Sequence, residues 1–416
     1  MSLGPITIFD KSTLQSFNPD EAVWFNNFYR ANITPLFFVE TLANLEKEMK
    51  DGRTPEQVVS NLAHKTPILG AMPNVHHQTL CMGDLLGHRV EMRRVPVISG
   101  GRPISDGAKK GVHFDQPPEF DALQRWEDGD FLGVERLFAR NWRQALADLD
   151  LRQNLRSLGL GSIKIRSLTE VREATKVIFN SDGRRYVTLK AALEILGVPD
   201  DIRPAIIARW KAEGGPTLKS FAPYAAYVVS VDVVFYLALA AGLISPDRVS
   251  NRIDFAYLYY LPFCMVFVSN DNLHARMAPL FLNEDQAFVR GQELKTDLSK
   301  LDQHYSALPL EIRERGIMSF APEPPREGDF LTALIWDQFL PGWRARTDRA
   351  DRVRNQVGDK AILDALKPMM EAAKRAAPAE AFDIKSADST IFSRKVPAKR
   401  GKWRIVPPEV ENERNQ

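Results

Sequence analysis

The feature that most constrains the fold of this chain is an apolar run from Tyr224 to Ile244. It contains 21 residues and a single charge, Asp232, so it is about long enough to cross a bilayer. A carboxylate in the middle of a membrane span is costly, and the flanks of this run lack the usual aromatic and basic anchors. Because a chain of 416 residues can bury a large core, we expect a buried helix, with a membrane span as the alternative.

Overall charge and cysteine usage exclude several classes of protein. Lys and Arg number 55 and Asp and Glu number 53, giving a formal net charge of +2, so no overall field attracts nucleic acid or a membrane. Cys81 and Cys264 are far apart and neither has a CxxC partner, which excludes a disulfide framework and a cysteine zinc site. The N-terminus lacks the pattern of a secretory signal. We therefore expect a cytoplasmic protein without stable membrane association.

Short β-branched runs predict buried strands of a parallel sheet. The first is Ile6–Phe9. A second strand-like run, Ile33–Val39, leads directly into a helix at Glu40, and Cys264–Val268 has the composition of another strand. The segments between them place apolar residues at helical spacings, so the sequence predicts an α/β fold with helices on both faces of the sheet.

The chain also divides into regions of different composition. Gly, Pro and His are frequent after residue 66, and helical spacing then dominates until the apolar run begins. We expect a core in two parts, an inserted subdomain that is first loop-rich and then helical, a helical C-terminal region and a flexible basic tail. The boundaries are 1–66 and 221–310 for the core, 67–220 for the insertion, 311–377 for the helical region and 378–416 for the tail.

Four carboxylates stand where a site is expected. Asp10 and Asp271 each follow a predicted strand, and ligands of α/β proteins gather beyond the carboxyl ends of parallel strands. Glu40 and Asp254 lie at the start of apolar helical stretches. Buried acids are costly unless they are paired or bind cations. Asp232 is either a fifth acid of this site or a buried partner of a residue in the insertion.

The order and spacing of these motifs resemble the PIN-domain ribonucleases. The motifs that carry the resemblance are ITIFDKS at residues 6–12, Glu40, Asp254 and the triplet Ser269-Asn270-Asp271. Together they cover the segments 4–65 and 221–282. The resemblance implies that the four acids are catalytic and bind metal, and that Ser12 and Ser269 support them. It also implies a PIN-like sheet whose two parts are separated by the long insertion.

Phosphodiester hydrolysis gives these acids a chemical role. The reaction needs a hard cation such as Mg²⁺ or Mn²⁺, whose preferred ligands are carboxylate oxygens and water. Crowded carboxylates should also hold each other's pKa values up until a cation binds. We therefore expect a metal-dependent ribonuclease in which Asp10, Glu40, Asp254 and Asp271, with Asp232 as a further candidate, hold the ion. The alternative is a non-catalytic PIN-like protein that binds nucleic acid or other proteins.

Several basic residues and one aromatic residue lie close together near the C-terminus. Such a mixture is typical of segments that bind single-stranded nucleic acid, although a merely solubilising tail has the same composition. The residues expected to contact RNA are Arg394, Lys395, Lys399, Arg400, Lys402, Trp403 and Arg404. A homo-oligomer or a protein partner would use the insertion.

The histidines carry a weaker signal. His76, His77, His88 and His113 show no metal-ligand spacing, so we expect satisfied or solvated side chains. His274 lies three residues after Asp271 and either reaches a substrate phosphate or is simply exposed.

Overall fold

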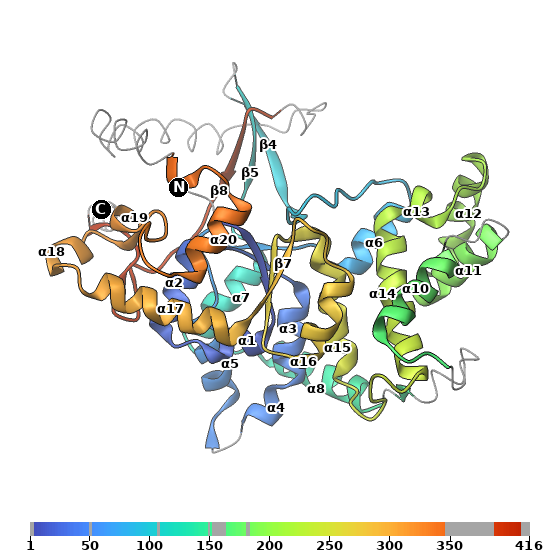
Figure 1. The fold of residues 1–416 in the computed structure, drawn as a ribbon, viewed down its shortest axis with the longest axis horizontal. Coiled ribbons are helices and arrows are strands. Elements are labelled where there is room, and N and C mark those ends of the chain that lie inside the picture. The colour runs from blue at the N-terminus through green and yellow to red at the C-terminus, as the bar shows by residue number, and fades with distance from the viewer. Residues whose placement is uncertain are drawn as a thin grey trace.

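The centre of the protein is a five-stranded parallel sheet (Figure 1). The computed structural model describes residues 4–49, 52–105, 109–148, 150–151, 164–179, 184–345 and 387–408. The strand order is β3-β2-β1-β6-β7, and every neighbouring pair is parallel. The strands are β1 (Ile6–Phe9), β2 (Arg30–Ile33), β3 (Met72–Pro73), β6 (Val266–Ser269) and β7 (Ala287–Arg290). The predicted α/β class with a parallel sheet is confirmed.

Both faces of the sheet are buried under helices. Ile6, Ile8 and Phe267 point into one hydrophobic cluster, whereas Phe9 and Val268 point into a second one on the opposite face. This alternation follows from the two-residue period of a strand. It explains why the strands contain continuous apolar runs, because a strand that is covered on both faces has no polar side.

Helices connect the strands and cover the sheet. The elements between β1 and β3 are α1 (Lys11–Ser16), α2 (Pro19–Phe28), α3 (Pro35–Ala43), α4 (Leu45–Glu48) and α5 (Pro55–Ala63). Those near β6 and β7 are α15 (Asn251–Ala256), η3 (Tyr257–Phe263), α16 (Asn272–Met277), η4 (Ala278–Leu280) and α17 (Gly291–Ser306). The helical C-terminal region contributes α18 (Leu310–Arg313), α19 (Ile317–Phe320) and α20 (Leu331–Phe339), and its residues 346–377 lie outside the described part of the chain.

The second strand is shorter than the sequence suggests. The expected strand Ile33–Val39 is wrong beyond its first residue, because β2 ends at Ile33 and α3 begins at Pro35. Thr34 has the extended backbone of a helix N-cap and Pro35 occupies the first helical position, where a fixed φ and a missing N–H are tolerated. Glu40 therefore lies in the interior of α3 and does not head the helix.

The insertion adds one strand to the main sheet and helices to both faces of that sheet. Its strand β3 pairs with β2 in the main sheet. Its helices α7 (Pro118–Glu127) and α8 (Gly133–Ala147) pack against α5 and α3. The remaining helices are α6 (His77–Leu85), α10 (Leu168–Phe179), α11 (Arg185–Ile195), α12 (Arg203–Ala212) and α13 (Leu218–Phe221). Because α6, α10, α11 and α13 surround α14 (Pro223–Ala240), the core and the insertion share one hydrophobic cluster.

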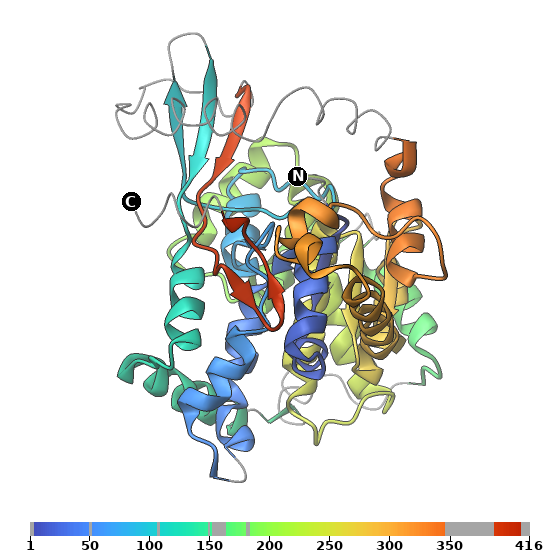
Figure 2. The same ribbon diagram turned by 90° about the vertical axis from the view of Figure 1, so that its left-hand side faces the viewer.

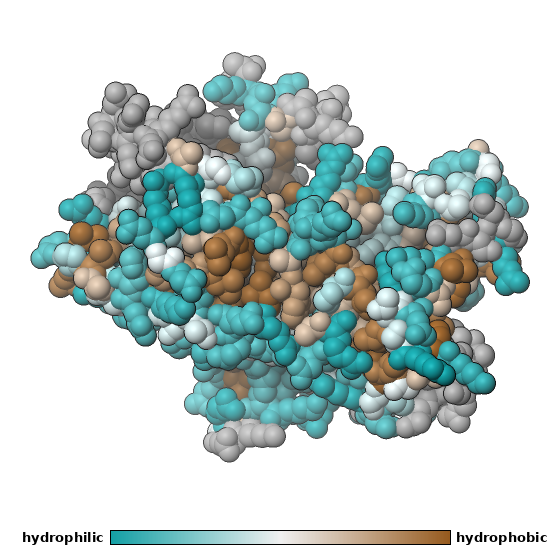
Figure 3. Space-filling model, in the orientation of Figure 1, coloured by the Kyte–Doolittle hydropathy of each residue, from teal (hydrophilic) through white to brown (hydrophobic). Residues whose placement is uncertain are grey.

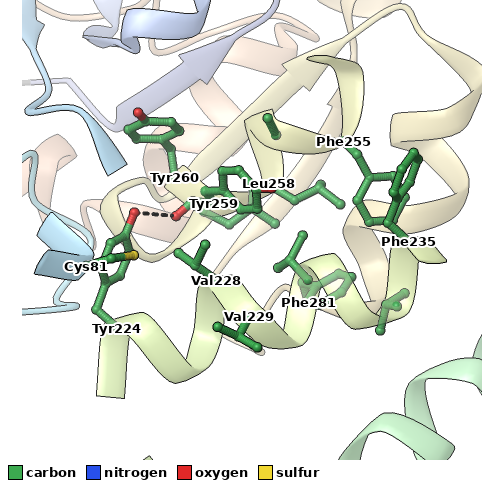
Figure 4. Packing of buried hydrophobic residues seen from close by; sticks show 14 of the residues in the cluster. Cys81, Tyr224, Val228, Val229, Phe235, Phe255, Leu258, Tyr259, Tyr260 and Phe281 are labelled. Carbon is green, nitrogen blue, oxygen red and sulfur yellow. Dashed lines mark hydrogen bonds between the residues drawn. The ribbon is translucent and has the colours of Figure 1, made fainter. Parts of the chain in front are cut away.

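Most of the apolar run from Tyr224 to Ile244 lies in α14. Among the described residues, it is the helix whose length and composition would allow it to cross a membrane. Here most of its side chains are buried against neighbouring elements. Figure 4 shows Tyr224, Val228 and Phe235 of α14 facing Leu258 and Tyr259 of η3. The phenol of Tyr224 donates a hydrogen bond to the Tyr259 carbonyl at 3.2 Å.

The C-terminal segment returns to the body of the protein. Strand β8 (Ser389–Phe392) pairs in parallel with β5 (Lys110–Phe114), which in turn pairs with β4 (Gly101–Ser105). The short hairpin of β9 (Lys399–Arg400) and β10 (Trp403–Arg404) follows, and both sets of strands are visible in Figure 2. Within residues 387–408 the predicted flexible tail is thus a folded segment.

Candidate active site

The site lies at the carboxyl edge of the sheet, between its two central strands. The chain leaves β1 toward β2 on one side and leaves β6 toward β7 on the other. This reversal of direction between adjacent strands opens the crevice in which open α/β sheets bind ligands. Asp10 follows β1 directly, and Asp271 lies two residues beyond β6. The expected placement of these two acids at one edge is confirmed.

Asp10 is buried and fully hydrogen-bonded. It caps α1, with Oδ1 accepting from the Thr13 amide at 2.9 Å. Its Oδ2 accepts from the hydroxyls of Ser12 at 2.8 Å and Ser269 at 2.7 Å. The structure therefore brings both predicted supporting serines to Asp10. Although burial alone would raise the pKa of Asp10, His274 and these donors hold it below its usual range.

His274 is the partner that the sequence interpretation misplaced. The prediction of an exposed or phosphate-contacting side chain is wrong, because only 1% of this residue is exposed. Its Nδ1 lies 2.7 Å from Ser269 Oγ and 3.6 Å from Asp10 Oδ2. Its Nε2 faces the backbone carbonyl of Asp254 at 2.6 Å, a group that can only accept. Both ring nitrogens therefore donate, and the side chain is an imidazolium.

The charge on His274 is maintained by its neighbours. Burial opposes it, but the ion pair with Asp10 and the field of Asp254 raise the pKa of His274 to about 9. The buried cation lies behind the acids and holds Asp10 and Ser269 in place.

Glu40 reaches the site from α3. Its Oε2 accepts a hydrogen bond from the hydroxyl of Tyr257 at 2.7 Å. Burial and the nearby charge of Asp10 raise the pKa of Glu40 to about 7, an effect that Lys11 only partly offsets. Lys11 itself is buried and forms an ion pair with Glu48. Glu40 therefore takes up a proton at a higher pH than an ordinary glutamate does.

Asp254 lies on the adjacent helix α15 and lacks a full set of partners. Its Oδ2 is buried and forms no hydrogen bond. Burial and the negative charge of Asp271 raise the pKa of Asp254 to about 6, against the opposing field of His274. The expectation that crowded acids raise each other's pKa values is thus confirmed for Glu40 and Asp254 and wrong for Asp10, which has its own buried cation.

Arg248 supplies the second positive charge. Its Nη2 lies 3.3 Å from Asp271 Oδ2 and 3.7 Å from Asp254 Oδ2, while 60% of the side chain is exposed. Asp271 also caps α16, with Oδ1 accepting from the Leu273 amide at 2.5 Å. The guanidinium therefore bridges two acids from the solvent side, and a flexible exposed side chain can leave that position at little cost.

The fit of a divalent cation to these residues depends on donor chemistry and spacing. The donors are carboxylate oxygens, which Mg²⁺ and Mn²⁺ prefer, and one buried oxygen of Asp254 lacks a partner. Asp254 and Glu40 have fewer partners than Asp10, and the guanidinium on Asp271 Oδ2 belongs to the largely exposed Arg248, whereas both oxygens of Asp10 accept hydrogen bonds from buried or half-buried donors. Among the residues that the structure describes, no three such side chains lie close enough together to enclose an ion.

Asp232 belongs to a different environment. Its Oδ1 lies 2.8 Å from Arg252 Nη1 and also accepts from the hydroxyl of Tyr259. Burial opposes the charge on Arg252, but Asp232 raises the pKa of that guanidinium. Of the two alternatives for Asp232, the structure favours the buried ion-pair partner over a fifth acid of the site, although this partner comes from α15 and not from the insertion.

Most of the basic residues of the C-terminal segment form contacts within the protein. The predicted base-stacking role of Trp403 is wrong, because this indole is 1% exposed and packs on Trp24 with ring centroids 4.7 Å apart. Arg400 forms an ion pair with Glu127, and Lys402 forms one with Asp302. The guanidinium of Arg394 covers the ring of Phe120, and Arg404 contacts Glu314. Lys395 and Lys399 are the members of the set that remain exposed without an ion pair among the described residues.

The other histidines lie away from the acids. His113 and His77 are largely buried, and His88 is exposed. His77 packs against Tyr259 and hydrogen-bonds to Tyr260, while burial and the neighbouring His76 lower its pKa to about 3. These residues are satisfied or solvated, as predicted.

Sequence reasoning singled out His274, which lies about one helical turn beyond Asp271, but gave it the wrong role, and it missed two further groups of the site. Arg248 and Tyr257 flank Asp254 in the sequence, but nothing in their spacing indicates which acid each would contact. The chain matches no family model, no curated protein and no solved structure in the comparisons made with it.

Proposed function

We propose that this protein is a metal-dependent nuclease with a PIN-like core that hydrolyses RNA. The observation that supports it best is the buried oxygen of Asp254, which forms no hydrogen bond and feels the charges of acids from three other chain segments beyond the carboxyl ends of β1 and β6. The electrostatic coupling of Glu40 to Asp10 and Asp254, and of Asp254 to Asp271, is further support. Purely structural acids are usually each paired with a cation.

Some residues of the site would bind the cation, and others would position the residues that bind it. Asp254, Asp271 and Glu40 would hold the cation, and Asp10 would fix the crevice through its bonds to Ser12, Ser269 and His274. A bound Mg²⁺ or Mn²⁺ would polarise the phosphoryl oxygen and lower the pKa of an attacking water. One of the carboxylates would accept the proton of that water. Arg248 would turn away from Asp254 and Asp271 and balance phosphate charge at the mouth of the crevice.

Cleavage assays test this proposal directly. Labelled RNA and single-stranded DNA are incubated with the purified protein in Mn²⁺ or in EDTA. We expect cleavage of RNA in Mn²⁺ only, and a loss of at least 100-fold in Asp254→Asn and Asp271→Asn. Glu311→Gln, an exposed acid of α18, is the matched control and should cleave normally. Activity in EDTA, or full activity in both acidic variants, contradicts the proposal.

Metal binding is measured separately from turnover. Mn²⁺ should raise the melting temperature of the wild type, because an ion that binds only the native state stabilises it. The shift should be much smaller in Asp254→Asn. An equal shift in both proteins would place the ion elsewhere.

The role of the C-terminal segment needs a narrower test than truncation, which would also remove the buried Trp403. The double variant Lys395→Gln/Lys399→Gln changes two exposed cations only. If these residues contact RNA, the dependence of log K on log[salt] should become shallower by about 1.4, from roughly 0.7 for each phosphate contact on a single strand. An unchanged slope removes them from the RNA-binding surface.

The non-catalytic alternative has one observation in its favour. Arg248 already bridges Asp254 and Asp271, so the acids could be a structural ion-pair network. In that case Arg248→Ala would lower the melting temperature and Mn²⁺ would not restore it. For a metal site, removal of the competing guanidinium should strengthen Mn²⁺ binding.

A further inference from the structure

A large cavity lies at the end of the sheet opposite to the acids. Its volume is about 1130 Å³. Residues 283–286, which directly precede β7, and Pro262, which precedes β6, form one side of it. Helices α10 and α14 form the other side. Over the region of these two helices Figure 3 shows apolar and polar residues next to each other, in brown and teal.

The walls of this cavity combine aromatic rings with an excess of positive charge. Phe179, Tyr227 and Phe281 contribute apolar surface. The hydroxyl of Tyr227 donates a hydrogen bond to the Leu258 carbonyl at 2.7 Å, so Tyr227 offers the cavity its ring and not its hydroxyl. Four lining residues are basic and two are acidic. They are Arg94, Arg172, Lys176, Lys219, Glu284 and Asp285.

Arg172 is the central cation of the cavity. Its guanidinium lies over the ring of Phe281, 4.5 Å from the centroid, and its Nε donates to the Leu280 carbonyl at 3.2 Å. Throughout the described ranges no carboxylate forms an ion pair with it. The partial burial of Arg172 lowers its pKa, an effect that the nearby Tyr227 and Glu173 offset only in part. A half-buried guanidinium of this kind is stabilised by an anion.

Arg94 provides an independent sign of a ligand site. Among the residues the structure describes, it is the non-glycine residue with a positive φ, at 64°. Its amide donates to the Pro262 carbonyl at 2.9 Å and its Nη2 contacts Asp285 at 2.7 Å, whereas its Nε is buried without a hydrogen-bond partner. Left-handed backbone at a residue other than Gly, Asn or Asp costs about 1 kcal/mol or more, and such strain concentrates at ligand clamps.

We propose that this cavity binds a small amphipathic anion, whose carboxylate or phosphate pairs with Arg172 and whose apolar or aromatic body packs on Phe281, Phe179 and Tyr227. A neutral apolar ligand would leave Arg172 unpaired, and a cation would be disfavoured by the excess of basic over acidic residues in the walls. The site is at the amino edge of the sheet, so it is separate from the proposed nuclease centre.

The first experiment uses the fluorescent anion 1-anilinonaphthalene-8-sulfonate with the full-length protein. We expect saturable binding that weakens at least tenfold in Arg172→Met, which keeps the aliphatic stem and removes the charge. Lys219→Gln changes only an exposed side chain at the rim, and it should weaken binding two- to fivefold. Arg93→Gln, an exposed residue outside the cavity, is the matched control. Wild-type affinity in both cavity variants overturns the proposal.

The second experiment needs no mutation and identifies the ligand class. Decanoate and decanol have the same apolar body and differ in charge, and adenosine monophosphate offers an aromatic body with a phosphate. Displacement of the probe by decanoate indicates an acyl carboxylate, and displacement by adenosine monophosphate indicates a nucleotide. Displacement by neither anion, or by decanol as strongly as by decanoate, overturns the proposal. Asp254→Asn should bind the probe normally, since the two sites are independent.

Discussion

Asp232 and Asp254 share one sequence pattern and have opposite environments. Both are single carboxylates in apolar helical sequence. Asp232 has Arg252 at 2.8 Å and the hydroxyl of Tyr259, whereas Asp254 has a buried oxygen without a hydrogen bond and a guanidinium no closer than 3.7 Å. The difference teaches that an acid in an apolar run becomes a candidate for function where the fold leaves one of its buried oxygens without a close partner.

The largest expected effect on stability comes from removing the charge of Asp232, the acid that is paired with Arg252. Asp232→Asn keeps the shape of the side chain and leaves Arg252 with a buried, uncompensated charge, so the free energy of unfolding should fall by about 2–4 kcal/mol. Urea denaturation measures this change. The double variant Asp232→Leu/Arg252→Met removes both charges and should regain most of the loss. Full stability in the single variant would mean that the ion pair does not hold α14 to α15.

Neutralising Glu40, which pairs with no cation among the described residues, should raise the free energy of unfolding instead of lowering it. The pKa of Glu40 is about 7 in the folded protein and 4.5 in the reference state, so the folded state binds the extra proton and loses stability as the pH rises from 4.5 to 7. Glu40→Gln removes this loss and should raise the free energy of unfolding by up to about 3 kcal/mol at pH 8. At pH 4 the two proteins should be equal.

The exposed Glu46, which pairs with Arg143 on the surface, offers a matched control for that measurement. Glu46→Gln should change stability by less than about 0.5 kcal/mol at either pH. A destabilised Glu40→Gln protein would show that the carboxylate is structural and would weaken the contrast with Asp232.

The smallest effect concerns the buried cation behind the acids. The pKa of His274 is raised from 6.5 to about 9, so its contribution to stability is complete below pH 6.5 and is lost as the pH rises through 9. Between pH 8 and 10, where Glu40 is largely ionised, the wild type should lose about 1 kcal/mol. His274→Gln should be less stable at pH 7 and should show little change across this interval. Parallel profiles for the two proteins would place the titration elsewhere.

Local sequence predicts those parts of the fold that depend on local chemistry. The strand Ile6–Phe9 is correct to the residue, because a β-branched run followed by a capping Asp has few other uses. The error at Ile33–Val39 is also local in origin. Phe37 and Phe38 look like strand residues, but Thr34 and Pro35 form a helix start that precedes them.

Contacts between distant segments explain what the sequence could not predict. Asp10 and Ser269 are 259 residues apart and meet because β1 and β6 are neighbours. The charge on His274 depends on that meeting, and so does the depressed pKa of Asp10. Trp403 lies among cations in the sequence, yet its partners Trp24 and Asp302 are in other regions of the chain, so composition alone suggested a solvated tail.

The packing of Trp403 has a consequence for protein synthesis. The ribosome releases Trp24 long before Trp403, and Asp302 accepts hydrogen bonds from both indoles. Until the final hairpin has left the ribosome, the nascent chain therefore carries exposed aromatic surface at Trp24 and an incomplete second hydrophobic cluster. Such surfaces are the ones that chaperones bind and that promote aggregation. Formation of the contact between Trp24 and Trp403 would cover this surface.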